Sequence, residues 1–191
     1  FRATSPASNR LIKDTHVPYA TATPVSLPHA SLPDADWADS FAITTSDPGI
    51  SPENAARNII LSQPGWIAPL MQLRNIVVRP FGLKPGVNEN GHEADKAGAG
   101  AGANDNSRTD QIGIFPVITR ADTSITLGMN DRHLDFRLVV EIEQFAGDQT
   151  VIRAITLIKR HNLLGRAYLG TIMPFHRAIV PAMLNAAYAC P

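Results

Sequence analysis

The C-terminal part of the chain, from residue 131 onward, constrains the fold more than any other part. Between residues 131 and 144, apolar and polar side chains alternate with the period of two that is typical of a strand with one buried face. The apolar members are Leu134, Phe136, Leu138, Val140 and Ile142, and Val139 is the single exception. Residues 150–160 repeat the pattern, and residues 146–148 have the composition of a short hairpin loop. The sequence therefore predicts a long antiparallel hairpin.

After the hairpin, the apolar period changes to that of a helix over residues 163–189. The apolar side chains on one side of this helix are Leu164, Tyr168, Ile172, Phe175, Ile179 and Met183. Pro174 removes one backbone hydrogen bond within the helix and predicts a kink. Because a hairpin that leads into such a helix must bury one sheet face against it, the sequence predicts an α+β domain.

Two regions of unusual composition lie outside this pattern. Residues 1–33 contain five prolines and should lie extended, either as a disordered leader or as an arm that packs on the domain or on a neighbouring subunit. The apolar side chains of such an arm are Val17, Tyr19, Val25 and Leu32. Residues 34–191 are expected to form a single domain, in which the Gly/Ala-rich residues 83–110 form a long mobile loop.

The remaining segments predict a strand, two short helices and more strands. Residues 36–44 place Trp37, Phe41 and Ile43 on one side of a first strand. Ser51 and Pro52 are a helix cap and a first helical residue, and residues 66–78 resume helical spacing. Residues 112–119 and 123–128 are strand-like, and Pro116 indicates a sheet edge or a bulge.

Charge, cysteine content and hydropathy narrow the classes of function. The 17 basic and 17 acidic side chains give no electrostatic reason to expect nucleic acid as a partner. The single cysteine, Cys190, excludes an intrachain disulfide, which fits a cytoplasmic location. No apolar run approaches the length of a transmembrane segment. No pair of histidines has the spacing of metal ligands, so no metal site is predicted. No apolar strand precedes the spaced glycines of residues 97–103, so no nucleotide cofactor is predicted either.

The order of the predicted elements is similar to that of the helix-grip fold, in which a curved antiparallel sheet wraps around a long C-terminal helix and encloses an apolar cavity. Four motifs resemble an uncharacterised bacterial family, domain of unknown function 2867, over residues 36–187. They are Leu127-Gly128, Asp131-Arg132-His133-Leu134-Asp135-Phe136-Arg137, His161-Asn162 with Leu164-Gly165-Arg166, and Pro174-Phe175-His176-Arg177. That family is similar to START lipid-transfer domains, polyketide cyclases and birch-pollen-allergen-like proteins, the SRPBCC superfamily. The resemblance implies a hydrophobic small molecule or lipid as the ligand.

In such a fold, the inward faces of the hairpin and of the last helix would line the ligand cavity. Small side chains at Ala154 and Thr156, opposite a kinked helix, would leave volume that larger residues fill elsewhere. The expected lining residues are Leu138, Ile142, Ala154, Thr156, Ile158, Tyr168, Ile172, Phe175 and Ile179, with Trp66 or Met71 as a cap. The first hypothesis is therefore a binding module for a lipophilic ligand.

Polar residues support two alternative hypotheses. Tyr168, His176 or Asp135 could act as acid or base in a cyclase-like or dehydratase-like enzyme, and Arg166, Arg177 and His161 could hold an anion at the cavity mouth. The structural alternative for Asp135 is a cross-strand charge pair, because a hairpin centred on Gly147 places it opposite Lys159. The same register places Glu141 opposite Arg153. A third interpretation is an accessory domain without a ligand, which would form a homodimer through an apolar patch.

Overall fold

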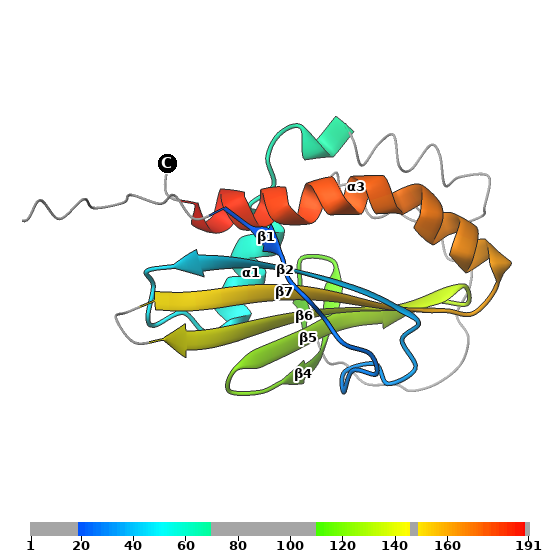
Figure 1. Ribbon diagram of the computed structural model, residues 1–191, viewed down its shortest axis with the longest axis horizontal. Helices are drawn as coiled ribbons and strands as arrows, with labels where there is room; N and C mark the ends of the chain where they lie inside the picture. Colours follow the sequence, from blue (N-terminus) through cyan, green and yellow to red (C-terminus); the bar gives the residue numbers. More distant parts are fainter. Residues whose placement is uncertain (1–18, 70–109, 146–148, 190–191) are drawn as a thin grey trace, which may run out of the picture.

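The computed structural model describes residues 19–69, 110–145 and 149–189. Within them, seven strands form one antiparallel, curved sheet in the order β1-β2-β7-β6-β5-β4-β3 (Figure 1). The strands are β1 (Thr21–Ala22), β2 (Trp37–Thr45), β3 (Gln111–Ile112), β4 (Phe115–Arg120), β5 (Ser124–Asn130), β6 (Leu134–Phe145) and β7 (Gln149–Arg160). The helices are α1 (Pro52–Leu61) and the C-terminal α3 (Leu163–Tyr188). The predicted α+β class, with an antiparallel sheet and a long C-terminal helix, is confirmed.

The long hairpin is β6 paired with β7, and its predicted register is confirmed. Glu141 lies opposite Arg153 and Asp135 lies opposite Lys159. The predicted loop, residues 146–148, lies outside the described residues. The first predicted strand is β2, which pairs with β7 from Trp37 to Thr45. Because β2 lies between β1 and β7 in the sheet order, the N-terminal strands of the domain extend the sheet beside its C-terminal hairpin.

Helix α1 begins where the sequence predicts. The Ser51 side chain caps it by accepting a hydrogen bond from the Asn54 backbone N–H at 3.2 Å, and Pro52 occupies the first helical position. Of the second predicted helix, residues 67–69 are helical, and the residues from 70 onward lie outside the described part. The predicted mobile loop, residues 83–110, also lies outside it, except for Asp110.

One face of the sheet forms the main hydrophobic core against both helices. Helix α3 contacts β2, β7 and α1, whereas α1 contacts β5 and β6. The core side chains from the strands are Phe41, Ile43, Ile112, Ile125, Leu127, Val140, Ile142, Ile152 and Ala154. The helices contribute Ala55, Ala56, Ile59, Ile60 and Leu184. Each helix therefore covers a different part of this face.

The opposite face of the sheet is partly covered by the segment that precedes β2. Val139, Ile155 and Leu157 are buried there, and Leu32 and Val25 pack against them. Figure 1 shows this segment, in blue, crossing the sheet after β1. The described part of the Pro-rich arm thus packs on its own domain. Because this packing buries both faces of β6 at one point, it explains why Val139 departs from the alternating pattern.

Hydrogen bonds fix the start of the arm. The Ala20 backbone N–H donates to Asn185 Oδ1 on α3 at 2.7 Å, and the hydroxyl oxygens of Thr23 and Ser40 lie 2.8 Å apart. Strand β1 pairs with β2 at the edge of the sheet. Tyr19 is 65% exposed, and Val17 lies outside the described residues. The described arm is therefore attached to α3, to β2 and to the second sheet face.

Tyr188, near the end of α3, gives a prediction about alkaline pH. Its hydroxyl donates to the Ala55 carbonyl oxygen at 3.3 Å, and burial raises its pKa to about 12. In the unfolded chain a tyrosine has a pKa of about 10. Between these values the unfolded state loses the proton while the folded state keeps it, so the free energy of unfolding falls as pH rises from about 10 to 12. Urea denaturation of Tyr188→Phe should show a shallower fall, and an equal fall in both proteins would contradict this.

Candidate functional site

The most enclosed polar pair lies between α3 and the sheet. His176 on α3 places Nε2 3.0 Å from Asp39 Oδ1 on β2, and each side chain is 17% exposed. Trp37 lies two residues before Asp39, on the same face of β2. Its ring meets the His176 ring edge-on, at a centroid distance of 5.9 Å. An imidazole that is held by a carboxylate in this way is a common arrangement for moving a proton or for binding a polar group.

One oxygen of this carboxylate lacks a partner. Asp39 Oδ2 is buried and accepts no hydrogen bond in the part of the chain that the structure describes. A buried acceptor without a donor costs about 1 to 3 kcal/mol, and more when it is charged. In native structures such an atom calls for an explanation, and a bound water molecule or a ligand group that donates a hydrogen bond is one.

The row of the sheet that contains Asp39 changes from polar to apolar along its length. Asp39 pairs with Thr156 on β7, and Thr156 pairs with Leu138 on β6. Leu138 in turn pairs with Leu127 on β5. Because residues opposite each other on neighbouring strands share a face and lie about 5 Å apart, the row runs from a polar end at Asp39 to an apolar end on the helix-facing side of the sheet. We call Trp37, Asp39, Thr156 and His176 the His176–Asp39 site.

Beyond this site, the sheet face carries apolar side chains that are only half-buried. Phe136 and Leu138 on β6 belong to this group, as do Phe115 and Val117 on β4. Phe115 and Phe136 lie in contact, with ring centroids 5.5 Å apart. Among the described elements, the main contacts of α3 with the sheet are with β2 and β7, and those of α1 are with β5 and β6. Phe115, Val117 and Leu138 pack against the main core, and each remains only half-buried.

The structure divides the predicted cavity residues between two environments. Thr156 and Ile158 are buried near the His176–Asp39 site, at 2% and 6% exposure, and Leu138 is half-buried beside them. Ala154 and Ile142 instead lie inside the main core. On α3, the predicted lining residues are half-buried: Tyr168, Ile172, Phe175 and Ile179. Trp66 is 47% exposed, and Met71 lies outside the described residues.

The other predicted polar residues do not meet at one point. His161 lies between β7 and α3, and its Nε2 is 3.1 Å from Asp135 Oδ1 on β6. Arg166 and Arg177 are exposed, and their separation along α3 corresponds to roughly 16 Å of helix. Arg177 also follows His176 directly, so the two side chains diverge by about 100° around the helix. The structure thus brings His176 to a carboxylate but does not gather the three anion-binding candidates.

The residues around His133 contact the N-terminus of α3. Asn162 Oδ1 accepts a hydrogen bond from the Gly165 N–H at 2.9 Å, which caps the helix, and its Nδ2 lies 3.1 Å from His133 Nδ1. The His133 carbonyl oxygen accepts from the His161 N–H at 3.0 Å. These contacts give the motif residues at this corner a structural role, because they fix the point at which β7 leads into α3.

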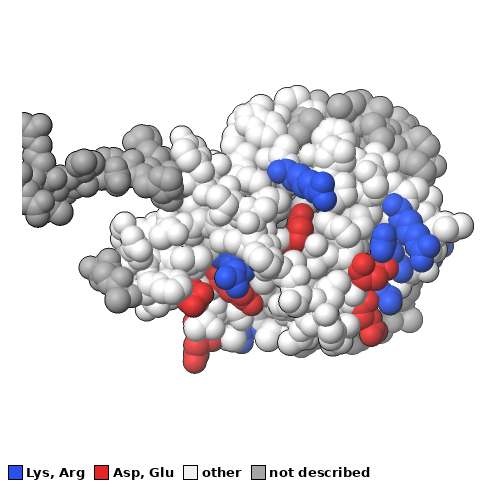
Figure 2. Space-filling model, in the orientation of Figure 1, with Lys and Arg blue, Asp and Glu red and all other residues white. Residues whose placement is uncertain are grey.

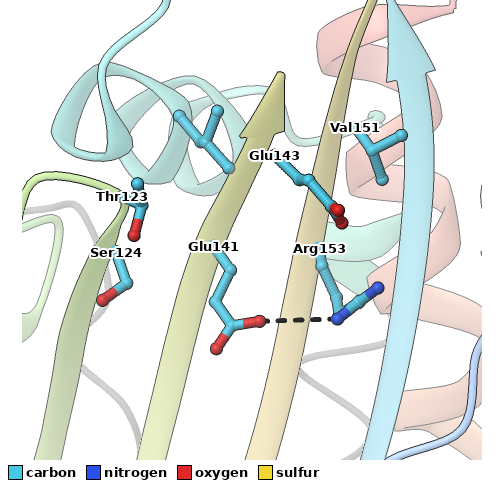
Figure 3. Close-up of a pocket in the computed structure, with 7 residues that line it drawn as sticks. Thr123, Ser124, Glu141, Glu143, Val151 and Arg153 are labelled. Carbon is cyan, nitrogen blue, oxygen red and sulfur yellow. Dashed lines mark ion pairs between the residues drawn. The ribbon is translucent and has the colours of Figure 1, made fainter. Parts of the chain in front are cut away.

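A second candidate site is an open polar hollow on the sheet face opposite α3 (Figure 3). It has a volume of about 390 Å³ and is lined by Thr123, Ser124, Glu141, Ile142, Glu143, Val151 and Arg153. Its Glu141–Arg153 ion pair spans 3.6 Å, and both side chains are about one-third exposed, at 35% and 36%. Arg153 Nε is also buried without an acceptor among the described residues. Its guanidinium already pairs with Glu141, however, and water screens these partly exposed charges, so the His176–Asp39 site is the stronger candidate.

The charges on the surface do not indicate a polyanionic partner. Figure 2 shows basic and acidic side chains in small neighbouring groups on the visible face, without an extended patch of one sign. Within the described ranges, no group of three or more His, Cys, Asp or Glu side chains is placed to hold a metal ion. No helix in that same part of the chain is long and apolar enough to cross a membrane.

Asp39 is the site residue that sequence reasoning missed. Trp37 and Phe41, two residues before and after Asp39 on β2, both face the helices, so Asp39 faces them too. A carboxylate at an inward position of a strand is unusual, because burying an unpaired charge is costly. That exception to the pattern was the available signal.

Comparison with known proteins identifies the chain at the family level. The family model described as "Protein of unknown function (DUF2867)" matches residues 31–183, which cover most of the chain and all strands from β2 to β7. Comparisons with curated proteins and with solved structures found no match.

Proposed function

Since the chain belongs to the DUF2867 family of proteins of unknown function, we propose a function from the site itself: the protein is a binding module for a small lipophilic molecule. The ligand lies between the first half of α3 and the sheet, with its polar end at the His176–Asp39 site. The observation that carries this proposal is the buried Asp39 Oδ2, which has no donor among the described residues and lies at the polar end of a row that continues into half-buried Leu138.

The arrangement of elements supports the proposal by analogy. A curved antiparallel sheet against a long C-terminal helix, with α1 between the first long strand and the remaining ones, is similar to the helix-grip order of the SRPBCC superfamily. Kinship with that superfamily, whose members include lipid-transfer domains, is part of the proposal. The half-buried side chains of α3, among them Ile172 and Phe175, would then contact the ligand. Fold analogy raises the expectation of a ligand but does not choose one.

Binding of Nile red, an uncharged apolar dye, tests this proposal. The wild-type chain is expected to enhance Nile red fluorescence, and Leu138→Gln is expected to weaken binding about ten-fold, because losing contact with one leucine costs about 1.5 kcal/mol. Leu163→Gln is the matched control, since Leu163 is 79% exposed. Equal affinities of the two variants would contradict the proposed location. Extraction of the purified protein for mass spectrometry would identify a co-purified ligand.

A second candidate function is a cyclase-like or dehydratase-like enzyme that uses the same site. The observation that favours it is the contact of His176 Nε2 with Asp39, which lets the imidazole exchange a proton with a bound molecule. Mass spectrometry distinguishes the two functions. Ligand extracted from wild type and from His176→Gln should have the same mass and the same chromatographic retention time if the protein only binds. If the pair catalyses a reaction, the retention times should differ, and for a dehydratase the masses should also differ by one water molecule.

A further inference from the structure

We propose that the His176–Asp39 site selects lipophilic ligands that end in a neutral hydroxyl group, an alcohol or a phenol, and disfavours those that end in a carboxylate. This inference rests on the proposed binding function and adds the chemical class of the ligand to it. The acceptor of this site is a carboxylate, so the site is opposite in charge to the anion-binding site that Arg166, Arg177 and His161 suggest in the sequence.

The free acceptor determines the polarity of the site. Asp39 Oδ1 is occupied by His176 Nε2, whereas Oδ2 is buried without a donor among the described residues. An ionised carboxylate only accepts hydrogen bonds, so the group that completes it must donate one. A hydroxyl satisfies this requirement without bringing a charge, and hydrogen bonds to a charged acceptor are about twice as strong as neutral ones.

A ligand carboxylate would meet the wrong charge. Two carboxylates in a poorly solvated site repel each other, and one of them must take up a proton before both can stay. The cations that could compensate lie elsewhere: Arg166 and Arg177 are exposed on α3. His176, for its part, already faces Asp39. The site thus holds one cation-capable group, His176, for one carboxylate, Asp39.

The spacing of the row sets the size of the ligand. Asp39, Thr156 and Leu138 occupy three successive strands, so Asp39 and Leu138 lie about 10 Å apart. Thr156 provides a hydroxyl group between them. A molecule of about two fused rings that carries one hydroxyl group is long enough to span from Asp39 to Leu138, and it would replace contacts that now bury Thr156, which is 2% exposed.

A series of three naphthalenes tests this inference with the full chain at pH 7. 2-Naphthol has the donor, 2-methoxynaphthalene lacks it, and 2-naphthoate replaces it with a negative charge. Isothermal titration calorimetry is expected to show that 2-naphthol binds at least about ten-fold more tightly than either of the other two, since a hydrogen bond to a charged group is worth that much. Equal affinities, or tighter binding of 2-naphthoate, would overturn the inference.

Variants assign the preference to Asp39. Asp39→Asn, checked for folding by circular dichroism, is expected to bring the affinities for 2-naphthol and 2-naphthoate within about three-fold of each other, because the repelling charge is gone. Glu141→Gln, on the opposite sheet face, should leave the full preference intact. A preference that survives in Asp39→Asn would reject Asp39 as its source. If Asp39→Asn does not fold, the wild-type ligand series still decides.

The same experiment separates this inference from the proposed function. Tight binding of Nile red and of all three naphthalenes, without a preference, would leave the binding module standing and remove only the ligand class. Failure of the chain to bind any of these apolar probes would instead remove the binding function and the inference together.

Discussion

Replacing Gly165 with alanine is expected to lower the free energy of unfolding by about 1 to 3 kcal/mol. A Cβ atom at this position would lie 2.3 Å from the His133 backbone oxygen, and a backbone atom cannot move aside as a flexible side chain can. The same oxygen accepts the His161 N–H, so a shift would also weaken that bond. Urea denaturation, followed by circular dichroism, measures the effect.

Gly170→Ala is the matched control on the same helix. No atom lies within 4 Å of a Cβ built at Gly170, which is exposed. Because alanine is a better helix former than glycine by about 1 kcal/mol, this variant should be more stable than wild type. The two glycine variants should therefore move in opposite directions. A stabilised Gly165→Ala variant would show that α3 does not lie as close to His133 as the structure places it.

Replacing Leu184 with alanine is expected to cost about 2 to 5 kcal/mol, because the change removes a fully buried side chain from the main core. Leu184 is 0% exposed and packs with residues of α1 and of the sheet. Ile172→Ala, earlier on the same helix, should cost about 1 kcal/mol, since Ile172 is only half-buried.

The comparison of these two variants tests how α3 is held. If the C-terminal half of the helix carries the packing and the first half is available to a ligand, Leu184→Ala should be clearly the more destabilising variant in urea. Adding a ligand such as 2-naphthol should stabilise wild type by mass action, and should stabilise Ile172→Ala less. Equal losses of stability in the two variants, without ligand, would indicate that both halves of α3 are core.

The parts of the fold that the sequence predicts are those that depend on local pattern. The β6–β7 hairpin follows from a period of two and a short polar loop, and together these fix its register, including Glu141 opposite Arg153. Helix α1 follows from its cap at Ser51. In both cases the residues that decide the structure are close together in the chain.

The parts that were not predicted depend on contacts between distant segments. The cover over Val139 comes from Leu32. The sequence suggests, as one alternative, that Leu32 packs on the domain, but it does not indicate the sheet face on which it packs. The sequence predicts space at Ala154 beneath a kinked helix, whereas the structure places Ala154 inside the main core shared with α1. A strand pattern gives the face of a residue, whereas the packing above that face is set by the rest of the chain.

The same difference between local pattern and long-range contact applies to the candidate site. His176 was predicted as an acid or base, but its partner Asp39 lies 137 positions earlier, and periodicity in either segment alone does not join them. Asp39 nevertheless interrupts the apolar face of β2, between Trp37 and Phe41. Polar residues at inward strand positions are therefore the most useful sites to examine first in a sequence of this kind.

Chemical shift changes in a ¹H–¹⁵N correlation spectrum, measured during titration of the full chain with 2-naphthol, test the central claim most directly. The account predicts saturable shifts at the amides of Asp39, Thr156 and His176, with little change at Ser124, Glu141 and Arg153 in the polar hollow on the opposite face. Shifts confined to the hollow, with the amides of the His176–Asp39 site unchanged, would contradict it.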